Sequence, residues 1–260
     1  MKVKPLGRDF ELDWDASRHN YELEKRKLHG ASAIAGMVGE TQWMIPWASG
    51  AVAKEADKVL DELGTDEILR KEYFRRIRWA HKKVTQGALD IGNTVHEWCA
   101  KFVDYKTGKA KKPAVPKNAI VKAAVMPFVK WVKDNDIEFL GSEEILYYAG
   151  DKYDYAGTSD VRFMKGGELC IGDFKTTKNY KGKWAKREMV FQCGLYGLAV
   201  EQSLDTTVDR LFLLRLPKIE GEEFDVIDFK FSDTLRDACR ELNNIRHLSF
   251  DIAHWLNNAS

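Results

Sequence analysis

The sequence lacks long apolar runs. Although 44% of its 260 residues are hydrophobic, no segment approaches the roughly eighteen uninterrupted apolar residues that a membrane-spanning helix needs. Residues 1–15 also contain no apolar segment of the kind that forms the core of a signal peptide. We therefore expect a soluble, globular, cytoplasmic protein with no membrane partner.

Closely spaced cysteines are also absent. The four cysteines are Cys99, Cys170, Cys193 and Cys239; no two form a C-x-x-C pair, and each lies in an apolar stretch. Zinc and iron–sulfur sites usually show tight cysteine spacing, so we expect buried free thiols and no iron–sulfur cluster. The phosphate-binding pattern G-x-x-x-x-G-K-[ST] is missing as well, so we expect no use of ATP.

Acidic residues are scarce in two segments. Residues 101–122 contain seven lysines and one acid, Asp104, and residues 175–187 contain six basic residues and no acid. With a net charge of only +1, a protein can still bind a polyanion through such local segments. The alternative interpretation is that they are solvated helix faces and a flexible loop.

Apolar periodicity predicts a mainly helical part, residues 1–135, followed by a part of order βββαββα, residues 136–260, within one integrated α/β or α+β domain. The predicted helices are Trp47–Leu63, Glu67–Thr85, Asp90–Tyr105, Ala119–Asn135, Lys183–Gln202 and Ser232–Leu248. The predicted strands are Glu143–Tyr148, Tyr155–Met164, Glu168–Lys175, Arg210–Leu216 and Phe224–Phe231. Residues 107–118, rich in lysine and with two prolines, are predicted to form a loop.

The segment GDFKTTK, residues 172–178, contains an Asp-x-Lys pair at Asp173 and Lys175. This pair is a weak signal by itself, because the same Asp-Phe-Lys tripeptide recurs at residues 228–230. Side chains alternate between the two faces of a strand, so Asp173 and Lys175 are expected to share one face at the end of their strand.

A tight turn is expected to bring a second carboxylate close to Asp173. Gly166 and Gly167 favour a hairpin between the two strands that carry Asp160 and Asp173. Two bare carboxylates about 4 Å apart near a protein surface repel by roughly 4 kcal/mol, and a shared proton or a hard divalent cation removes this repulsion. Lys175 would then orient or deprotonate a water and offset charge on a phosphate, which suits metal-assisted phosphodiester hydrolysis.

Three further features occur in the same order along the chain. His96 lies among apolar neighbours on a predicted helix, where it could be a core residue or a metal ligand. Glu143 and Glu144 begin a predicted strand, so only one of them can face inward. Gln192 and Tyr196 are four residues apart on a predicted helix and therefore share a face.

The combined pattern resembles the RecB-like branch of the PD-(D/E)XK nuclease superfamily, and it is most similar to the compact phage-encoded exonucleases of that branch. The resemblance runs from about Ala31 to Tyr196, and its specific elements are His96, Glu143, G-x-x-D ending at Asp160, D-x-K-T from Asp173, and Q-x-x-x-Y from Gln192. It implies an α/β fold in which a restriction-endonuclease-like core, a mixed sheet flanked by helices, follows a helical N-terminal part that contributes the histidine.

The resemblance also implies a role for each matching residue. A Mg²⁺ or Mn²⁺ ion would be held by His96, Asp160, Asp173 and the backbone carbonyl of Phe174. The catalytic residues would be Asp160, Asp173, Lys175 and Glu143, with Glu144 as the alternative to Glu143. The residues expected to hold DNA are Gln192, Tyr196, Thr176, Lys178, Lys181 and Lys183.

The activity implied by the resemblance is that of a divalent-metal-dependent DNA exonuclease in phage DNA recombination, repair or degradation. Such an enzyme would act in the host cytoplasm, and a single-strand annealing protein could be its partner. The basic segments 101–122 and 178–187 would contact phosphates. Two alternatives remain open: a structure-specific endonuclease on the same fold, and a nucleic-acid-binding module without catalytic activity.

Overall fold

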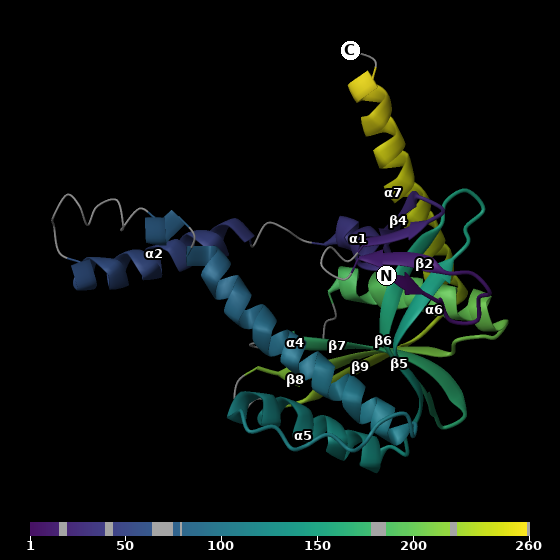
Figure 1. Cartoon of the computed structure of the whole chain (residues 1–260), viewed down its shortest axis with the longest axis horizontal. Helices are drawn as coiled ribbons and strands as arrows, with labels where there is room; N and C mark the ends of the chain where they lie inside the picture. The colour runs from purple at the N-terminus through teal and green to yellow at the C-terminus, as the bar shows by residue number, and fades with distance from the viewer. Residues whose placement is uncertain are drawn as a thin grey trace. The chain divides into compact units, whose positions relative to one another are not determined.

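The computed structural model in Figure 1 describes residues 1–15, 20–39, 44–63, 75–78, 80–177, 186–218 and 223–258. The chain divides into two compact units: a sheet unit of Met1–Gly39 and Val95–Ser260, and a helical unit of Glu40–Thr94. The helical unit contains α2 (Met44–Leu63), and the division falls within α4 (Ala80–Lys106). None of the helices that the structure describes is both long and apolar enough to cross a membrane.

The sheet unit contains all nine strands of the described chain: β1 (Lys2–Val3), β2 (Leu12–Asp15), β3 (Asn20–Leu23), β4 (Arg26–Gly30), β5 (Glu138–Tyr148), β6 (Tyr155–Lys165), β7 (Glu168–Thr177), β8 (Arg210–Pro217) and β9 (Asp225–Lys230). Its helices, besides the end of α4, are α1 (Ala31–Ala35), the short η1 (Gly36–Val38), α5 (Ala119–Asp134), α6 (Arg187–Leu204) and α7 (Asp233–Asn258). The predicted strands and helices after residue 118 are confirmed, although β5 begins earlier and α7 ends later than predicted. Most of the predicted helix Glu67–Thr85 lies outside the described residues.

The four strands β1–β4 were not predicted from the sequence. They pair as successive antiparallel strands, and their apolar residues Leu12, Tyr21 and Leu28 form a small core with residues of β5 and β6. The β3–β4 turn is formed by Glu24 and Lys25 with φ of 50° and 67°, so no glycine marks it. Residues 1–30 therefore extend the sheet, whereas the predicted mainly helical part began at residue 1.

The strands form one mixed sheet in the order β1-β2-β3-β4-β6-β7-β8-β9, with β5 paired to the other edge of β6. Two strands pair with the edge of β6 that faces away from β5. Along it, β7 pairs antiparallel with residues 161–165, and β4 pairs parallel with residues 155–156. The predicted hairpin between β6 and β7 is confirmed, and both turn residues, Gly166 and Gly167, have positive φ of 59° and 83°. Among the strands that the structure describes, none pairs with residues 157–160 of β6 on that edge.

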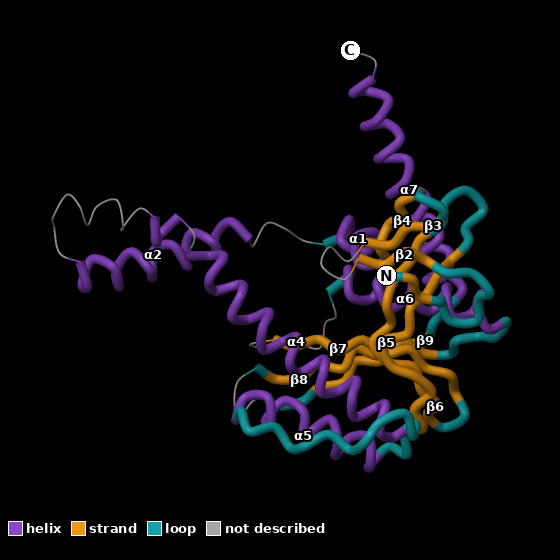
Figure 2. The backbone as a smooth tube through the Cα atoms, in the orientation of Figure 1, coloured by secondary structure: helices purple, strands orange, loops and turns teal. Residues whose placement is uncertain are grey.

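Helices cover both faces of the sheet, as Figure 2 shows for α5 and α6. Successive residues of β7 point to opposite faces. Phe174 packs against Phe128 of α5, with ring centroids 5.2 Å apart, whereas Lys175 donates a hydrogen bond to Gln192 of α6. The mixed α/β fold with a helix-flanked sheet therefore places the Asp173–Lys175 segment between two helical layers.

Candidate active site

The predicted site lies where β6 and β7 separate. Their pairing ends at Val161 and Gly172, and Asp160 and Asp173 are the next residues on the two strands. Beyond this point β7 continues beside β8, and β6 continues beside β5. The backbone N–H of Phe174 crosses the opening and donates to Oδ2 of Asp160 at 2.7 Å. We call this opening the fork; it brings the two carboxylates together, as the hairpin predicted.

A chain of polar contacts fixes Lys175 at the fork. Its Nζ lies 2.7 Å from Oδ2 of Asp173 and donates a hydrogen bond of 3.0 Å to Oε1 of Gln192. Nε2 of Gln192 in turn donates to the hydroxyl of Tyr196 at 2.8 Å. Asp173 is 1% exposed and Tyr196 is 4% exposed. Gln192 and Tyr196 thus support the lysine from α6, and the buried Tyr196 has almost no surface to offer to DNA.

His96 reaches the fork from α4. Its Nδ1 lies 3.6 Å from Oδ2 of Asp160, and its ring packs edge-on against Phe174 at 5.9 Å. Burial lowers the pKa of His96, an effect that the negative charge of Asp173 partly opposes. The imidazole is therefore neutral near pH 7, which is the form that can coordinate a metal ion.

Negative charge is concentrated between the two strands. Burial raises the pKa of Asp160 well above its usual range, and the neighbouring charge of Asp173 raises it further. Burial alone would lower the pKa of Lys175, but the carboxylates of Asp173 and Asp160 outweigh it, so the pKa is raised. The fork therefore holds a protonated lysine and two carboxyl groups whose ionised forms a further cation would stabilise.

The structure distinguishes the two glutamates in the middle of β5. Glu144 forms two hydrogen bonds of 2.8 Å with the guanidinium of Arg162. Glu143 as a whole is exposed. The protein atoms around its carboxyl group nevertheless raise the pKa of that group, and the charges of Asp104 and Asp173 raise it further. Glu143 is thus the glutamate whose charge interacts with the fork, while Glu144 is occupied by an arginine.

The donors at the fork fit a hard divalent cation by type. Two carboxylates, a backbone carbonyl and a neutral imidazole are ligands that Mg²⁺ or Mn²⁺ accepts. Within the described ranges, however, no three His, Cys, Asp or Glu side chains are arranged around a common point. Asp160 accepts from the Phe174 amide and Asp173 is paired with Lys175, in each case through Oδ2, so a metal ion would bind the other carboxylate oxygens or displace these contacts.

Of the remaining predicted DNA contacts, the structure describes Thr176, which lies near the end of β7. Thr176 is half-buried on this strand, beside Leu216 of β8. Lys178, Lys181 and Lys183 fall outside the residues that the structure describes. Their positions relative to DNA stay predictions.

The second Asp-Phe-Lys segment is an ordinary strand. It lies on β9, at the end of the strand order, and Asp228 forms an ion pair with Arg210 of the neighbouring β8. Lys230 is exposed to solvent. The tripeptide alone therefore carries no catalytic information, as the sequence context indicated.

One contact near the fork was missed by sequence reasoning. The hydroxyls of Tyr21 on β3 and Thr158 on β6 lie 2.6 Å apart, although 137 residues separate them in the chain. Thr158 belongs to the stretch of β6 before Asp160 that pairs with β5 but, among the described strands, with neither β4 nor β7. No sequence signal links these two residues, because β3 lies in a segment whose strands have no clear pattern.

Gly157 is required by the close approach of a ring. A Cβ atom at this position would lie 2.8 Å from Cε1 of Tyr196 and 3.1 Å from Cβ of Ala31. The Tyr196 ring can therefore lie against β6 only because residue 157 has no side chain. The glycine of the G-x-x-D pattern thus leaves room for Tyr196, which bonds Gln192, the partner of Lys175.

Replacing Gly157 with alanine should lower the free energy of unfolding by about 1–3 kcal/mol, because the added methyl group overpacks the buried Tyr196 ring. Urea unfolding of the purified protein measures this change. Gly36→Ala is the matched control, since a Cβ there meets no atom within 4 Å. Equal stability of the Gly157 variant and the wild type would contradict the role given to this glycine.

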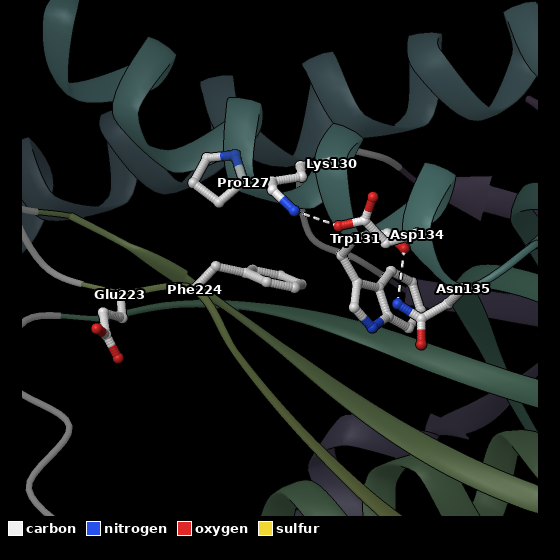
Figure 3. Close-up of a pocket in the computed structure, with 7 residues that line it drawn as sticks. All are labelled: Pro127, Lys130, Trp131, Asp134, Asn135, Glu223 and Phe224. Carbon is white, nitrogen blue, oxygen red and sulfur yellow. Dashed lines mark hydrogen bonds and ion pairs between the residues drawn. The ribbon is translucent and has the colours of Figure 1, made fainter.

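A separate hollow of about 460 Å³ lies between α5 and the start of β9, and Figure 3 shows its lining. The lining residues are Pro127, Lys130, Trp131, Asp134, Asn135, Glu223 and Phe224. Trp131 and Phe224 provide aromatic surface, while Lys130 is paired with Asp134. None of the predicted site residues lines it. Its lining contains two acids and a single lysine, which is already paired with one of those acids, so the hollow does not favour binding of a phosphate.

Some solved structures resemble the chain at low sequence identity. A candidate exonuclease from Eubacterium rectale is 15% identical, with 62% of this chain and 66% of that chain covered and a TM-score of 0.43. An alkaline exonuclease from Laribacter hongkongensis is 11% identical, with 78% of this chain and 91% of that chain covered and a TM-score of 0.38. No protein-family model matches the sequence, and neither does any curated protein.

Proposed function

We propose that the protein is a divalent-metal-dependent exonuclease that hydrolyses the phosphodiester bonds of DNA. The observation that carries this proposal is the fork, which gathers His96, Asp160, Asp173 and Lys175 from three separate elements. These residues match the RecB-like pattern in type and in order. The exonuclease names of the two similar structures agree with the proposal, although their likeness to this chain is too low to carry it.

The residues of the fork would divide the chemistry among them. Asp160, Asp173, His96 and the carbonyl of Phe174 would hold Mg²⁺ or Mn²⁺, which supplies a water of lowered pKa and neutralises phosphate charge. Lys175 remains protonated, because the carboxylates raise its pKa. Its ammonium group would donate to a phosphate oxygen and stabilise the charge that develops in the transition state.

The supporting residues hold this arrangement in position. Gln192 accepts from Lys175 and donates to Tyr196, which fixes the direction of the lysine side chain. Glu143, exposed and electrostatically linked to Asp173, is the acid that we place on the substrate side of the fork. Thr176 and the lysines at 178, 181 and 183 would contact the DNA strand that enters it.

The biological setting that we infer is phage DNA recombination, repair or degradation. An exonuclease of this kind exposes single strands, which a single-strand annealing protein could then bind. Without a phosphate-binding motif for ATP in the sequence, the reaction would draw on no nucleotide hydrolysis by this chain.

The purified protein should remove label from the ends of linear DNA in the presence of Mg²⁺ or Mn²⁺ and should leave closed circular DNA intact. Chelation with EDTA should abolish the reaction. The assay uses single- and double-stranded substrates labelled at either the 5′ or the 3′ end, which also reveals polarity. Cutting of the circle would favour the endonuclease, binding without any cleavage would favour the idle module, and full activity in EDTA would refute a metal-dependent mechanism.

A further inference from the structure

A surface rich in lysine extends from the end of α4, along residues 107–118, to the first turn of α5. Residues 105–133 contain eight lysines and neither aspartate nor glutamate. All eight are exposed, and we call the first six the lysine strip: Lys106, Lys109, Lys111, Lys112, Lys117 and Lys122. All six belong to the sheet unit, as does His96.

The charge of the lysine strip is not compensated by neighbouring acids. No lysine of the strip forms an ion pair with a described residue, whereas Lys101 pairs with Glu97 and Lys130 with Asp134. The acid nearest in sequence, Asp104, accepts a hydrogen bond of 2.9 Å from the Ser142 hydroxyl on β5. A run of exposed lysines without internal counter-charges favours binding of a polyanion.

The segment that carries the strip is held against the helices. Nε1 of Trp98 on α4 donates to the carbonyl of Ala114 at 2.8 Å. At the other end, the side chain of Asn118 caps α5 by accepting from the N–H groups of Ile120 and Val121. Residues 107–118 are thus anchored to the helices at Ala114 and Asn118. Binding through such a pre-positioned segment loses less conformational entropy.

The distance along α4 relates the strip to the fork. His96 and Lys106 are ten residues apart on one helix, which corresponds to about 15 Å at 1.5 Å per residue. Phosphates of one DNA strand follow each other about every 3.4 Å along the helix axis. Lys106, the first lysine of the strip, therefore lies about four to five nucleotide spacings from His96 along α4.

We propose that the lysine strip binds the phosphate backbone of DNA outside the nucleotides that the fork holds. The identification of the polyanion as DNA rests on the proposed function. Substrates too short to reach the strip lose these contacts. The strip thus makes the protein select long DNA over short oligonucleotides, a property that the fork alone does not provide.

The test replaces Lys109, Lys111 and Lys112 with glutamine in the full-length protein. Binding of a labelled duplex of about 30 base pairs is measured in EDTA over a range of salt concentrations. The slope of log K against log salt should shrink by about 2–3 units, since each lost duplex contact contributes about 0.9. Affinity for the long duplex at about 0.1 M salt should fall at least about tenfold. The cleavage rate of the long duplex, divided by that of a substrate of about five base pairs, should fall by a similar factor.

A matched control removes the same charge elsewhere. Lys27, Lys152 and Lys230 are exposed and lie outside the strip, and their triple glutamine variant should keep the wild-type slope. An unchanged slope in the strip variant, or an equal loss in the control, would overturn the proposal. Binding is measured without metal and is therefore independent of cleavage. If DNA binding depends on the strip but DNA is never cleaved when metal is added, the proposed function is overturned and the proposal for the strip stands.

Discussion

Replacing Lys175 with methionine should reduce the rate of DNA cleavage by about 10²–10³-fold, because the transition state loses a preorganised cationic donor. Methionine keeps much of the side-chain volume but can neither pair with Asp173 nor bond Gln192. Lys175→Arg should lose most of the activity as well, since the planar guanidinium cannot reproduce the geometry of the ammonium at the fork. Single-turnover cleavage of labelled linear DNA measures both variants.

The chain offers a control for this experiment within its own sequence. Lys230 occupies the same place in the second Asp-Phe-Lys tripeptide but is exposed on β9, so Lys230→Met should cleave DNA at the wild-type rate. Thermal unfolding establishes that all variants are folded. Wild-type rates for a folded Lys175→Met variant would refute the catalytic role of this lysine.

Truncation of Phe128 to alanine should lower the free energy of unfolding by about 3–5 kcal/mol, the range for a fully buried phenylalanine. Phe128 is 0% exposed, and its ring contacts Phe102, Phe139 and Phe174. Its loss therefore opens a cavity between α5 and the strand that carries the catalytic segment. Guanidinium unfolding monitored by fluorescence measures the change.

Phe224 provides the comparison for Phe128. It belongs to the same aromatic cluster, with its ring centroid 6.3 Å from that of Phe128, but it is only partly buried beside the hollow. Phe224→Ala should cost less than half as much stability, because part of its surface already meets water. Equal losses for the two variants would contradict the assignment of Phe128 to the centre of this layer.

The sequence predicted the part of the fold that local signals determine. The hairpin between β6 and β7 follows from strand alternation and from Gly166 and Gly167, which adopt the positive φ that this turn needs. The strands β1–β4 were missed, because they are short and the turn of Glu24 and Lys25 takes positive φ without glycine. Their place in the sheet depends on the parallel pairing of β4 with β6, a contact between distant segments that periodicity cannot reveal.

For the candidate site, too, the sequence predicted the contacts that local geometry determines. The proximity of Asp160 and Asp173 follows from the hairpin, and the arrangement of Gln192 and Tyr196 follows from helical spacing. The choice between Glu143 and Glu144 did not follow from alternation. Glu143 has a φ of 48°, so regular strand geometry fails at that residue. The sequence also contains no sign that Tyr196 requires the absence of a side chain at Gly157.

The shared edge of β6 has a consequence for how the protein folds. His29 and Tyr155, which pair where β4 meets β6, are 126 residues apart, so this part of the sheet closes a very long loop. Contacts of such high sequence separation slow folding, because chain entropy is lost before they can stabilise the structure. The hairpin of β6 and β7, by contrast, is local and can form early. We therefore expect the catalytic carboxylates to come together before the first thirty residues complete the sheet beside them.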